Sequence, residues 1–345
     1  MPNSWLSCAL VATKMKGPPH LTCLSNLLAE SAGPTEAQTV LKKILVVDDS
    51  PVDRMLVGRL LEQNSEWSVQ FAEDGRLAIE AIDTMAKKED GRLPDLVVTD
   101  LQMPYISGME LVNHLKQSHP SIPIVLITGF GSEQVAMDAL RCGAANYTPK
   151  SGLQKDLQRT VSHVLEMSDR VRINQVHDQS CTEECQLAFV LENDQSLIGP
   201  LIEHLQTKLP KWSEPDRLQI GMALDEALVN AMHHGNLEVE SSLRATGEPD
   251  EEDKYYSEIR TRKSKEPFCD RRVQVRASFS NRAIEIQVKD EGPGFDPEQV
   301  ADPRSPENLT RVSGRGLFLI RTFMDAVTHN NAGNEITLQK NRKTV

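Results

Sequence analysis

The chain has 345 residues, of which 26% are charged, and its formal net charge is −12 at pH 7. This length predicts two domains, and the acidic balance argues against a protein that coats nucleic acid and favours a soluble, cytoplasmic one. No apolar run approaches the roughly 20 residues that a membrane span needs, and the six cysteines are scattered, so reduced thiols are expected rather than a zinc site.

Residues 1–40 show no clear hydrophobic period, and we interpret them as a poorly ordered extension. From residue 41 to residue 167, apolar strands alternate with helical patterns five times. Strands are expected at 41–47, 69–71, 96–99, 124–127 and 145–148, each followed by a helix. This alternation predicts an α/β domain with a doubly wound, five-stranded parallel sheet.

Five polar side chains follow the ends of these strands: Asp48, Asp49, Asp100, Thr128 and Lys150. In an open parallel sheet the strand ends form one crevice. Three carboxylates there repel one another unless a divalent cation such as Mg²⁺ is present, and a hydroxyl and an ammonium group complete a phosphoryl site. A single aspartate at such a place is usually a helix cap or a turn residue, but five side chains in register predict phosphoryl chemistry.

The motifs that these residues belong to are V-D-D-S at 47–50, D-L-Q-M-P at 100–104, T-G at 128–129 and Y-T-P-K at 147–150. Through them, residues 42–167 resemble a response-regulator receiver domain. The resemblance implies that Asp100 accepts a phosphoryl group from an upstream histidine kinase or phosphotransfer protein. It assigns Mg²⁺ to Asp48, Asp49, Asp100 and the carbonyl of Gln102, and phosphoryl contacts to Thr128 and Lys150. Tyr147 is then the aromatic residue that turns inward on phosphorylation.

Residues 168–185 are mixed and polar, and we interpret them as the end of a long helix that runs into a linker. An amphipathic helix for dimerisation or signal relay is the alternative, which leaves a homodimer open. No helix-turn-helix pattern or basic reading helix occurs, so direct nucleic-acid binding is not expected.

The remainder, residues 186–345, predicts an α/β sandwich in which helices cover one face of a mixed sheet. Strands are expected at 187–191, 273–279, 283–288, 326–328 and 335–340, and helices at 197–209, 215–234 and 317–324. Residues 238–272 interrupt this pattern with acidic and then basic residues, which predicts a disordered insertion. Residues 297–313 are rich in proline, serine and asparagine, as expected of a mobile lid.

The predicted helix at 215–234 carries the motif D-E-A-L-V-N-A-M-H-H-G-N at 225–236. Glu226 and Asn230 are four residues apart and therefore share one helix face. A carboxylate and an amide oxygen so placed suit a divalent metal and its water, although a polar rim on a surface helix explains them equally well. Two glycine motifs follow, D-E-G-P-G-F at 290–295 and G-R-G-L at 314–317. Glycines let the backbone approach a ligand, and a helix start exposes N–H groups to phosphate.

In this order the three motifs resemble the ATP-binding domain of the GHKL superfamily, and most of all the anti-sigma-factor serine/threonine kinases. The resemblance implies that Asn230 binds Mg²⁺, that Glu226 is the catalytic base, and that Asp290 accepts the adenine amino group of ATP. The residues implied to surround the rest of the nucleotide are Gly292, Gly294, Arg311, Gly314, Arg315 and Gly316.

Two classes of function follow. The first is a response regulator whose phosphorylation controls a serine/threonine kinase that phosphorylates an anti-sigma antagonist and sequesters a sigma factor. The second is a binding module that uses ATP as a structural ligand without turnover. A histidine kinase is a third interpretation, which is disfavoured because His163 and His177 lack the H-E-x-R-x-P context.

Overall fold

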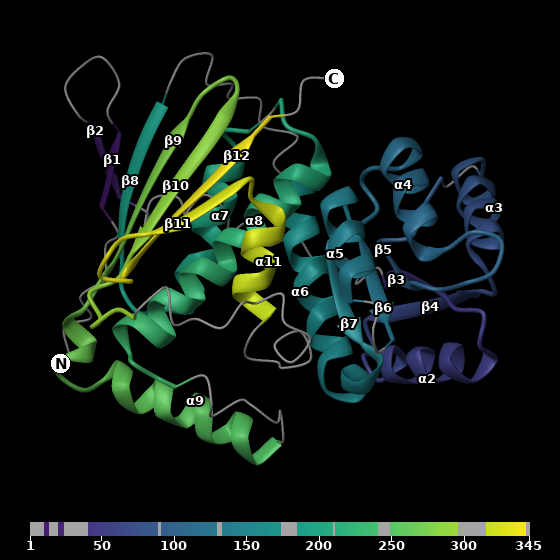
Figure 1. Cartoon of the computed structure of the whole chain (residues 1–345), viewed down its shortest axis with the longest axis horizontal. Helices are drawn as coiled ribbons and strands as arrows, with labels where there is room; N and C mark the ends of the chain where they lie inside the picture. Colours follow the sequence, from purple (N-terminus) through teal and green to yellow (C-terminus); the bar gives the residue numbers. More distant parts are fainter. Residues whose placement is uncertain are drawn as a thin grey trace. The chain divides into compact units, whose positions relative to one another are not determined.

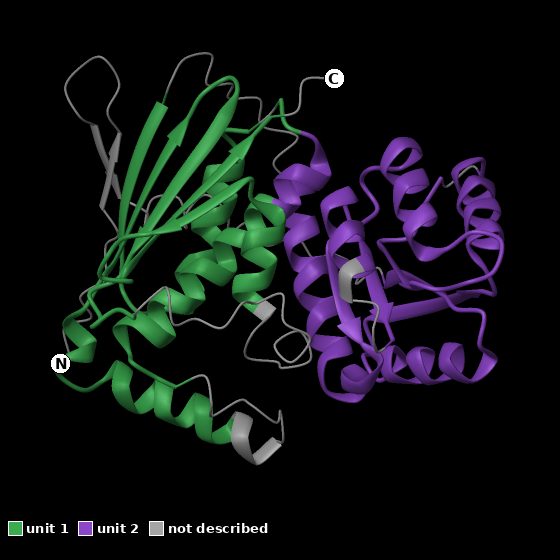
Figure 2. Ribbon diagram, viewed as in Figure 1, with its two compact units in different colours: residues 1–35, 174–212, 220–345 green, residues 36–173, 213–219 purple. Residues whose placement is uncertain are grey.

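The computed structural model describes residues 10–13, 20–23, 41–88, 91–129, 133–173, 185–209, 211–240, 249–295 and 315–342. The chain divides into two compact units (Figure 2). The first unit described below is purple in Figure 2 (its unit 2) and comprises residues 36–173 and 213–219. The second is green in Figure 2 (its unit 1) and comprises residues 1–35, 174–212 and 220–345.

The first unit contains a five-stranded parallel sheet with helices between successive strands (Figure 1). In sheet order its strands are β4 (Trp67–Ala72), β3 (Lys42–Val47), β5 (Leu96–Asp100), β6 (Ile124–Thr128) and β7 (Asn146–Pro149). The helices are α2 (Pro51–Glu62), α3 (Gly75–Ala86), α4 (Gly108–Ser118), α5 (Glu133–Cys142) and α6 (Leu153–Ile173). The predicted doubly wound fold is confirmed.

Local signals explain why these elements begin where they do. All five residues of β5 and of β6 are buried, as expected of central strands covered on both faces. Three helices begin at residues whose side chains cap the helix: Ser50 caps α2, Asp74 caps α3 and Ser107 caps α4. Each cap ends the loop that follows the preceding strand. Helix α6 continues past residue 167 with Val171 buried, so residues 168–173 belong to this unit rather than to a linker.

The second unit contains a seven-stranded sheet in the order β11-β12-β10-β9-β8-β1-β2. The strands are β1 (Leu10–Thr13), β2 (His20–Cys23), β8 (Cys185–Leu191), β9 (Val273–Phe279), β10 (Ala283–Lys289), β11 (Ala326–His329) and β12 (Glu335–Asn341). Helices α7 (Ile198–Gln206), α8 (Glu214–Asn230) and α11 (Arg315–Phe323) lie against one face of the sheet (Figure 1). None of the helices in the described parts of the chain is both long enough and apolar enough to cross a membrane.

The expectation of a mixed sheet is wrong, because every strand pair described in it is antiparallel. The helix α11 connects β10 to β11, which run in the same direction. These two strands are not neighbours, since β12 returns between them and pairs with both.

Two segments that were expected to be disordered contain regular structure. Within the predicted insertion, residues 249–263 form helix α9 (Pro249–Lys263), and Phe268–Asp270 form a short 3₁₀ turn. The charged composition concealed Tyr255 and Ile259, which are four residues apart and both buried. In the N-terminal extension, β1 and β2 pair with each other, and β1 pairs with β8.

Candidate phosphoryl and nucleotide sites

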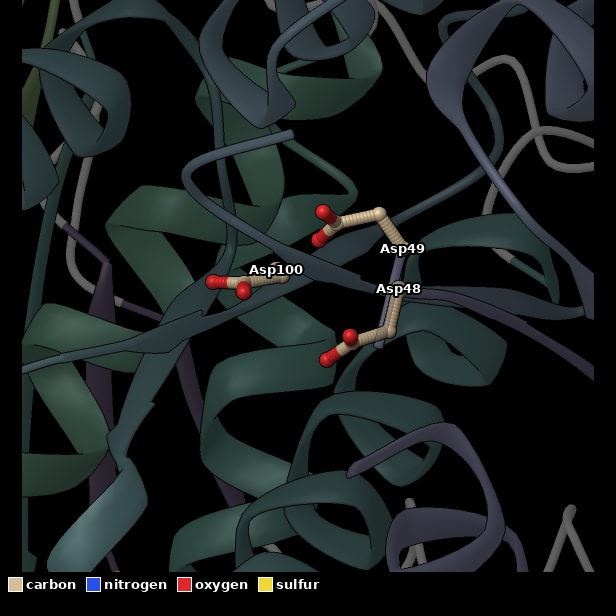
Figure 3. Close-up of side chains that lie close together, drawn as sticks. All are labelled: Asp48, Asp49 and Asp100. Carbon is tan, nitrogen blue, oxygen red and sulfur yellow. The ribbon is translucent and has the colours of Figure 1, made fainter. Parts of the chain in front are cut away.

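Asp48, Asp49 and Asp100 bring their carboxylates together at the ends of β3 and β5 (Figure 3). One oxygen from each side chain lies within 4.8 Å of the other two. Asp48 and Asp100 are buried, whereas Asp49 is exposed. Oxygen donors at this spacing can hold a hard divalent cation, which is the arrangement predicted from the strand ends.

The environment of Asp48 tests whether these residues fit a cation. Its Oδ1 accepts a hydrogen bond from the Ser50 amide at 2.8 Å, while its buried Oδ2 has no hydrogen-bond partner among the described residues. Burial, together with the nearby charge of Asp100, raises the pKa of Asp48 to about 6. A buried carboxylate oxygen without a donor is costly, and a cation at this point offsets that cost. The cluster therefore fits Mg²⁺.

Lys150 faces the same cluster. Its ammonium group donates to Asp100 Oδ2 at 2.9 Å and to Asp53 Oδ2 at 2.7 Å. Burial by itself lowers the pKa of Lys150, but the hydrogen bonds to Asp53 and Asp100 raise it well above its usual value. Lys150 is therefore cationic and placed to neutralise charge on Asp100. Sequence reasoning missed Asp53, because an acidic residue in the first turn of a helix is ordinarily explained by the helix dipole.

The loop after β5 is folded back onto Asp100. The carboxylate of Asp100 accepts a hydrogen bond from the Leu101 amide at 2.7 Å. A side chain at Gly108 would collide with the carbonyl oxygen of Asp100, so this close return of the chain requires glycine. The loop turns at Tyr105, whose backbone lies in the left-handed region with φ of 64° and whose side chain is exposed.

The remaining predicted residues of this site lie at its edge. Thr128 ends β6 and is buried, one residue beyond Ile127, which pairs with Asp100 across the sheet. Gln102 is exposed at the start of the loop. Tyr147 lies on β7 and is 2% exposed. Its expected movement on phosphorylation stays a prediction.

In the second unit, the structure brings Glu226 and Asn230 together with Gly316. Both side chains are half-buried on α8. A side chain at Gly316 would collide with the Glu226 carboxylate, and its Cβ would lie 3.8 Å from Asn230 Nδ2. The start of α11 therefore approaches the predicted metal and base residues closely. Arg311 and Gly314 lie outside the described residues, as does the side chain of Arg315.

Asp290 forms a second part of this site at the end of β10. Its Oδ1 accepts a hydrogen bond from the Gly292 amide at 2.9 Å. A side chain at Gly235 would collide with the Asp290 carboxylate, so the motif helix lies directly against it. Burial raises the pKa of Asp290 to about 6, although the Gly292 amide and the positive charge of Arg271 oppose this shift.

The turn at 330–334 supports the D-E-G-P-G-F loop. The Asp290 amide donates to the Asn334 carbonyl at 3.0 Å. Gly294 has φ of 76°, and a side chain there would collide with the Ala332 carbonyl. The turn therefore packs directly against the loop that follows Asp290.

The motif helix changes geometry at its end. Residues 231–236 form a π-helical turn, closed by a hydrogen bond from the Leu237 amide to the Met232 carbonyl at 3.0 Å. Asn236 is fully buried; its Oδ1 accepts from the Glu291 amide at 2.8 Å and its Nδ2 donates to Asn193 Oδ1 at 2.8 Å. Asn236 thus links the motif helix to the glycine loop, a role that sequence reasoning did not assign. Single π-helical turns occur frequently at functional sites.

Comparison with known proteins is consistent with both sites. The family model of the response regulator receiver domain matches residues 44–162, and that of the histidine kinase-like ATPase domain matches residues 201–340.

Curated relatives match over the receiver region. A protein-glutamate methylesterase/protein-glutamine glutaminase of Treponema denticola is 32% identical over 127 residues, which are 36% of this chain and 32% of that protein. The transcriptional regulatory protein YdfI of Bacillus subtilis is 29% identical over 122 residues, which are 35% of this chain and 54% of that protein. The chain thus spans about a third to a half of the length of these relatives.

Solved structures with similar folds are receiver domains. One is a response regulator receiver domain protein from Clostridium thermocellum, with 26% identity, a TM-score of 0.34, and coverage of 37% of this chain and 98% of that chain. Another is the receiver domain of NtrX from Brucella abortus, with 30% identity, a TM-score of 0.30, and coverage of 34% of this chain and 98% of that chain.

The acidic cluster and Lys150 lie in the region that the receiver model matches. The three nucleotide motifs, at 225–236, 290–295 and 314–317, lie in the region that the ATPase model matches. Residues 44–162 therefore form a response regulator receiver domain, and residues 201–340 form a histidine kinase-like ATPase domain.

Proposed function

We propose that this chain is a cytoplasmic response regulator in which phosphorylation of Asp100 controls an ATP-dependent serine/threonine kinase. The observation that carries the receiver half is the buried, unsatisfied Oδ2 of Asp48 beside Asp100 and Lys150. A cation held there offsets the negative charge of the incoming phosphoryl group. The Asp100 carboxylate attacks phosphorus, the bond from phosphorus to the donor breaks, and Lys150 stays paired with the new acyl phosphate.

The donor is an upstream histidine kinase or phosphotransfer protein. Helix α2, which begins two residues after Asp49, exposes three apolar side chains at helical spacing: Val52, Met55 and Leu56, with 74%, 56% and 37% exposure. Exposed apolar side chains grouped at the edge of a reactive site suit a protein partner. This supports phosphoryl transfer from another protein rather than from a metabolite alone.

In the second domain, Asn230 would hold Mg²⁺ and Asp290 would accept the adenine amino group. Mg²⁺, when bound, would neutralise negative charge on the phosphates of ATP. Glu226 lies beside Gly316 at the start of α11, where helix N–H groups favour phosphate. In this position Glu226 takes the proton of a substrate hydroxyl. The oxygen of that hydroxyl attacks the γ-phosphorus of ATP, and ADP leaves. The proposed substrate is an anti-sigma antagonist protein, and the proposed binding partner, which this domain sequesters, is a sigma factor.

The test is transfer from γ-labelled ATP to candidate antagonist proteins. Glu226→Gln is expected to keep Mg²⁺-dependent nucleotide binding and lose transfer, whereas Asn230→Ala is expected to lose binding. Glu203→Gln, a half-buried glutamate on α7, is the matched control. Wild-type transfer by Glu226→Gln would remove Glu226 from the mechanism and favour the alternative, a module that holds its partner with ATP and without turnover.

Control by the receiver is tested by comparing antagonist phosphorylation and sigma-factor affinity with and without phosphorylation at Asp100. A coupling free energy of roughly 1–3 kcal/mol, or about 5–150-fold, is expected, since this is the usual range between two linked sites. Asp100→Asn should show no response to the phospho-donor. If neither quantity changes by more than about twofold in the wild type, the domains are merely tethered.

A further inference from the structure

The insertion at 249–272 packs against the end of the motif helix. Tyr255 of α9 is fully buried in an apolar cluster with three other side chains, Leu237, Val239 and Ile259. Its hydroxyl lies 3.0 Å from Nδ1 of His233, which is itself buried in the π-helical turn. The insertion is therefore part of the core beside the nucleotide motifs.

Two arginines of the insertion also bind backbone carbonyls that follow the motif helix. Arg262 donates to the carbonyls of Leu237, at 2.9 Å, and Glu238, at 2.6 Å. Arg271 donates to the Asn236 carbonyl at 2.8 Å and to the Glu238 carboxylate at 2.7 Å. Carbonyls at a helix end lack intrahelical partners, and cations are favoured there. Glu238 has φ of 52°, a conformation uncommon for this residue type, and the two arginines hold it.

Arg271 also belongs to a closed ring of hydrogen bonds that reaches the nucleotide motif. Its guanidinium binds the Asn236 carbonyl; the Asn236 side chain donates to Asn193; and the Asn193 amide donates to the Arg271 carbonyl at 3.3 Å. Asn236, a member of this ring, also accepts a hydrogen bond at its Oδ1 from the amide of Glu291, the residue that follows Asp290. The positive charge of Arg271 also acts on the Asp290 carboxylate.

We propose that Arg271 is a positioning residue that sets the affinity and base preference of the nucleotide pocket from within the insertion. It acts through Asn236, which holds the glycine loop, and through its charge near Asp290. Through Arg271, the insertion fixes the position of the loop that contacts the base. This inference rests on the proposed nucleotide binding at Asp290.

The experiment measures binding of ADP and of GDP, with Mg²⁺, to the full-length chain by calorimetry. Arg271→Gln is expected to weaken ADP binding about tenfold or more, since it removes charge-assisted hydrogen bonds that hold the pocket. Arg271→Lys keeps the charge, but its shorter, non-planar head group does not place a nitrogen where Nη1 of Arg271 meets both acceptors, so an intermediate loss is expected. The ratio of GDP to ADP dissociation constants should fall in both variants, because loosening the base-binding loop removes discrimination. A merely structural role would leave that ratio unchanged.

Arg260→Gln is the matched control, because Arg260 lies in the same insertion, on helix α9, and is exposed. Tyr255→Phe removes only the hydroxyl beside His233 and should weaken ADP binding less than Arg271→Gln does. If Arg271→Gln does not fold, Arg271→Lys decides the question. Dissociation constants and base ratios for the Arg271 variants within twofold of Arg260→Gln would overturn the inference. Failure of the wild type to bind ADP would instead overturn the proposed function.

Discussion

Asp48 of the receiver and Asp290 of the ATPase domain are both buried at the end of a strand, and burial raises the pKa of each to about 6. Their surroundings differ. Asp48 faces the carboxylates of Asp100 and Asp53 as well as the ammonium group of Lys150, which lies 4.0 Å from its Oδ2, and only its Oδ1 accepts a hydrogen bond from the described residues. Asp290 faces a backbone amide and the positive charge of Arg271.

The difference shows two ways of keeping a buried carboxylate reactive. In the proposed function, the receiver cluster takes up Mg²⁺ before Asp100 reacts, whereas Asp290 accepts a neutral hydrogen-bond donor such as the amino group of a base. The two carboxylates should therefore differ in their response to Mg²⁺, to pH and to loss of charge.

Phosphorylation of the receiver should depend absolutely on the cluster. Asp100→Asn, or removal of Mg²⁺ by a chelator, is expected to reduce labelling by a small phospho-donor more than about 100-fold, because the nucleophile or the charge compensation is lost. The label on the wild type should be base-labile, as an acyl phosphate is. Asp138→Asn, an exposed carboxylate on α5, serves as the control. Labelling of Asp100→Asn at the wild-type level would contradict the assignment.

Removing the Asp48 charge should stabilise the protein. At pH 7.5 Asp48 is ionised against its raised pKa, so Asp48→Asn is expected to increase the free energy of unfolding in metal-free buffer by about 1–3 kcal/mol. Denaturant titration with and without Mg²⁺ measures this. Mg²⁺ should stabilise the wild type and not Asp48→Asn. Asp290→Asn, which removes a carboxylate of equally raised pKa elsewhere, should keep the response to Mg²⁺; loss of that response would break the contrast.

Nucleotide affinity should fall as the pH falls through the pKa of Asp290. The ionised carboxylate accepts the amino group and the protonated form does not, so binding is full above pH 7 and about tenfold weaker at pH 5. The contribution of Asp290 to stability without nucleotide has the opposite sign: with a raised pKa, it is greatest at low pH and is lost as pH rises through about 6. ADP titrations from pH 5 to pH 8 measure the first effect. Asp290→Asn should show no such step, and a step that persists in it would assign the titration to another group.

The smallest effect is expected at Asp53. Asp53→Asn removes one of the two partners of Lys150, but the Asp53 side chain is 35% exposed and Lys150 keeps its bond to Asp100. The initial rate of Asp100 phosphorylation should therefore change by less than about fivefold. A change of more than about tenfold would show that Asp53 takes part in holding the cation or the phosphoryl group.

The receiver could be predicted almost completely because its signals are local. The central strands are short apolar runs, three of the helices begin at side-chain caps, and the functional side chains follow strand ends, where parallel topology brings them together. What escaped prediction was Asp53, whose partner Lys150 is 97 residues away in the chain. The burial of the Tyr147 side chain also depends on packing, which a single sequence does not show.

The ATPase domain was predicted less completely because its specific features depend on distant contacts. Glu226, Asn230 and Asp290 were recognisable as motifs, but helix α9 was not, since among its described side chains only Tyr255 and Ile259 are buried and they lie among charges. The antiparallel arrangement depends on β12 returning between β10 and β11. The role of Arg271 follows only from its three-dimensional contacts with Asn236 and Asn193.

The π-helical turn at 231–236 has a consequence for how this site tolerates changes in chain length. A turn closed by the bond from Leu237 to Met232 holds one residue more than an α-helical turn does. An α-helical turn one residue shorter would end in nearly the same place, whereas returning the present residues to α-helical geometry would rotate everything after them by about 100° around the helix axis. Asn236 would then no longer meet the Glu291 amide, although every residue of the nucleotide motifs would remain. In this helix, spacing is as much a functional property as residue identity.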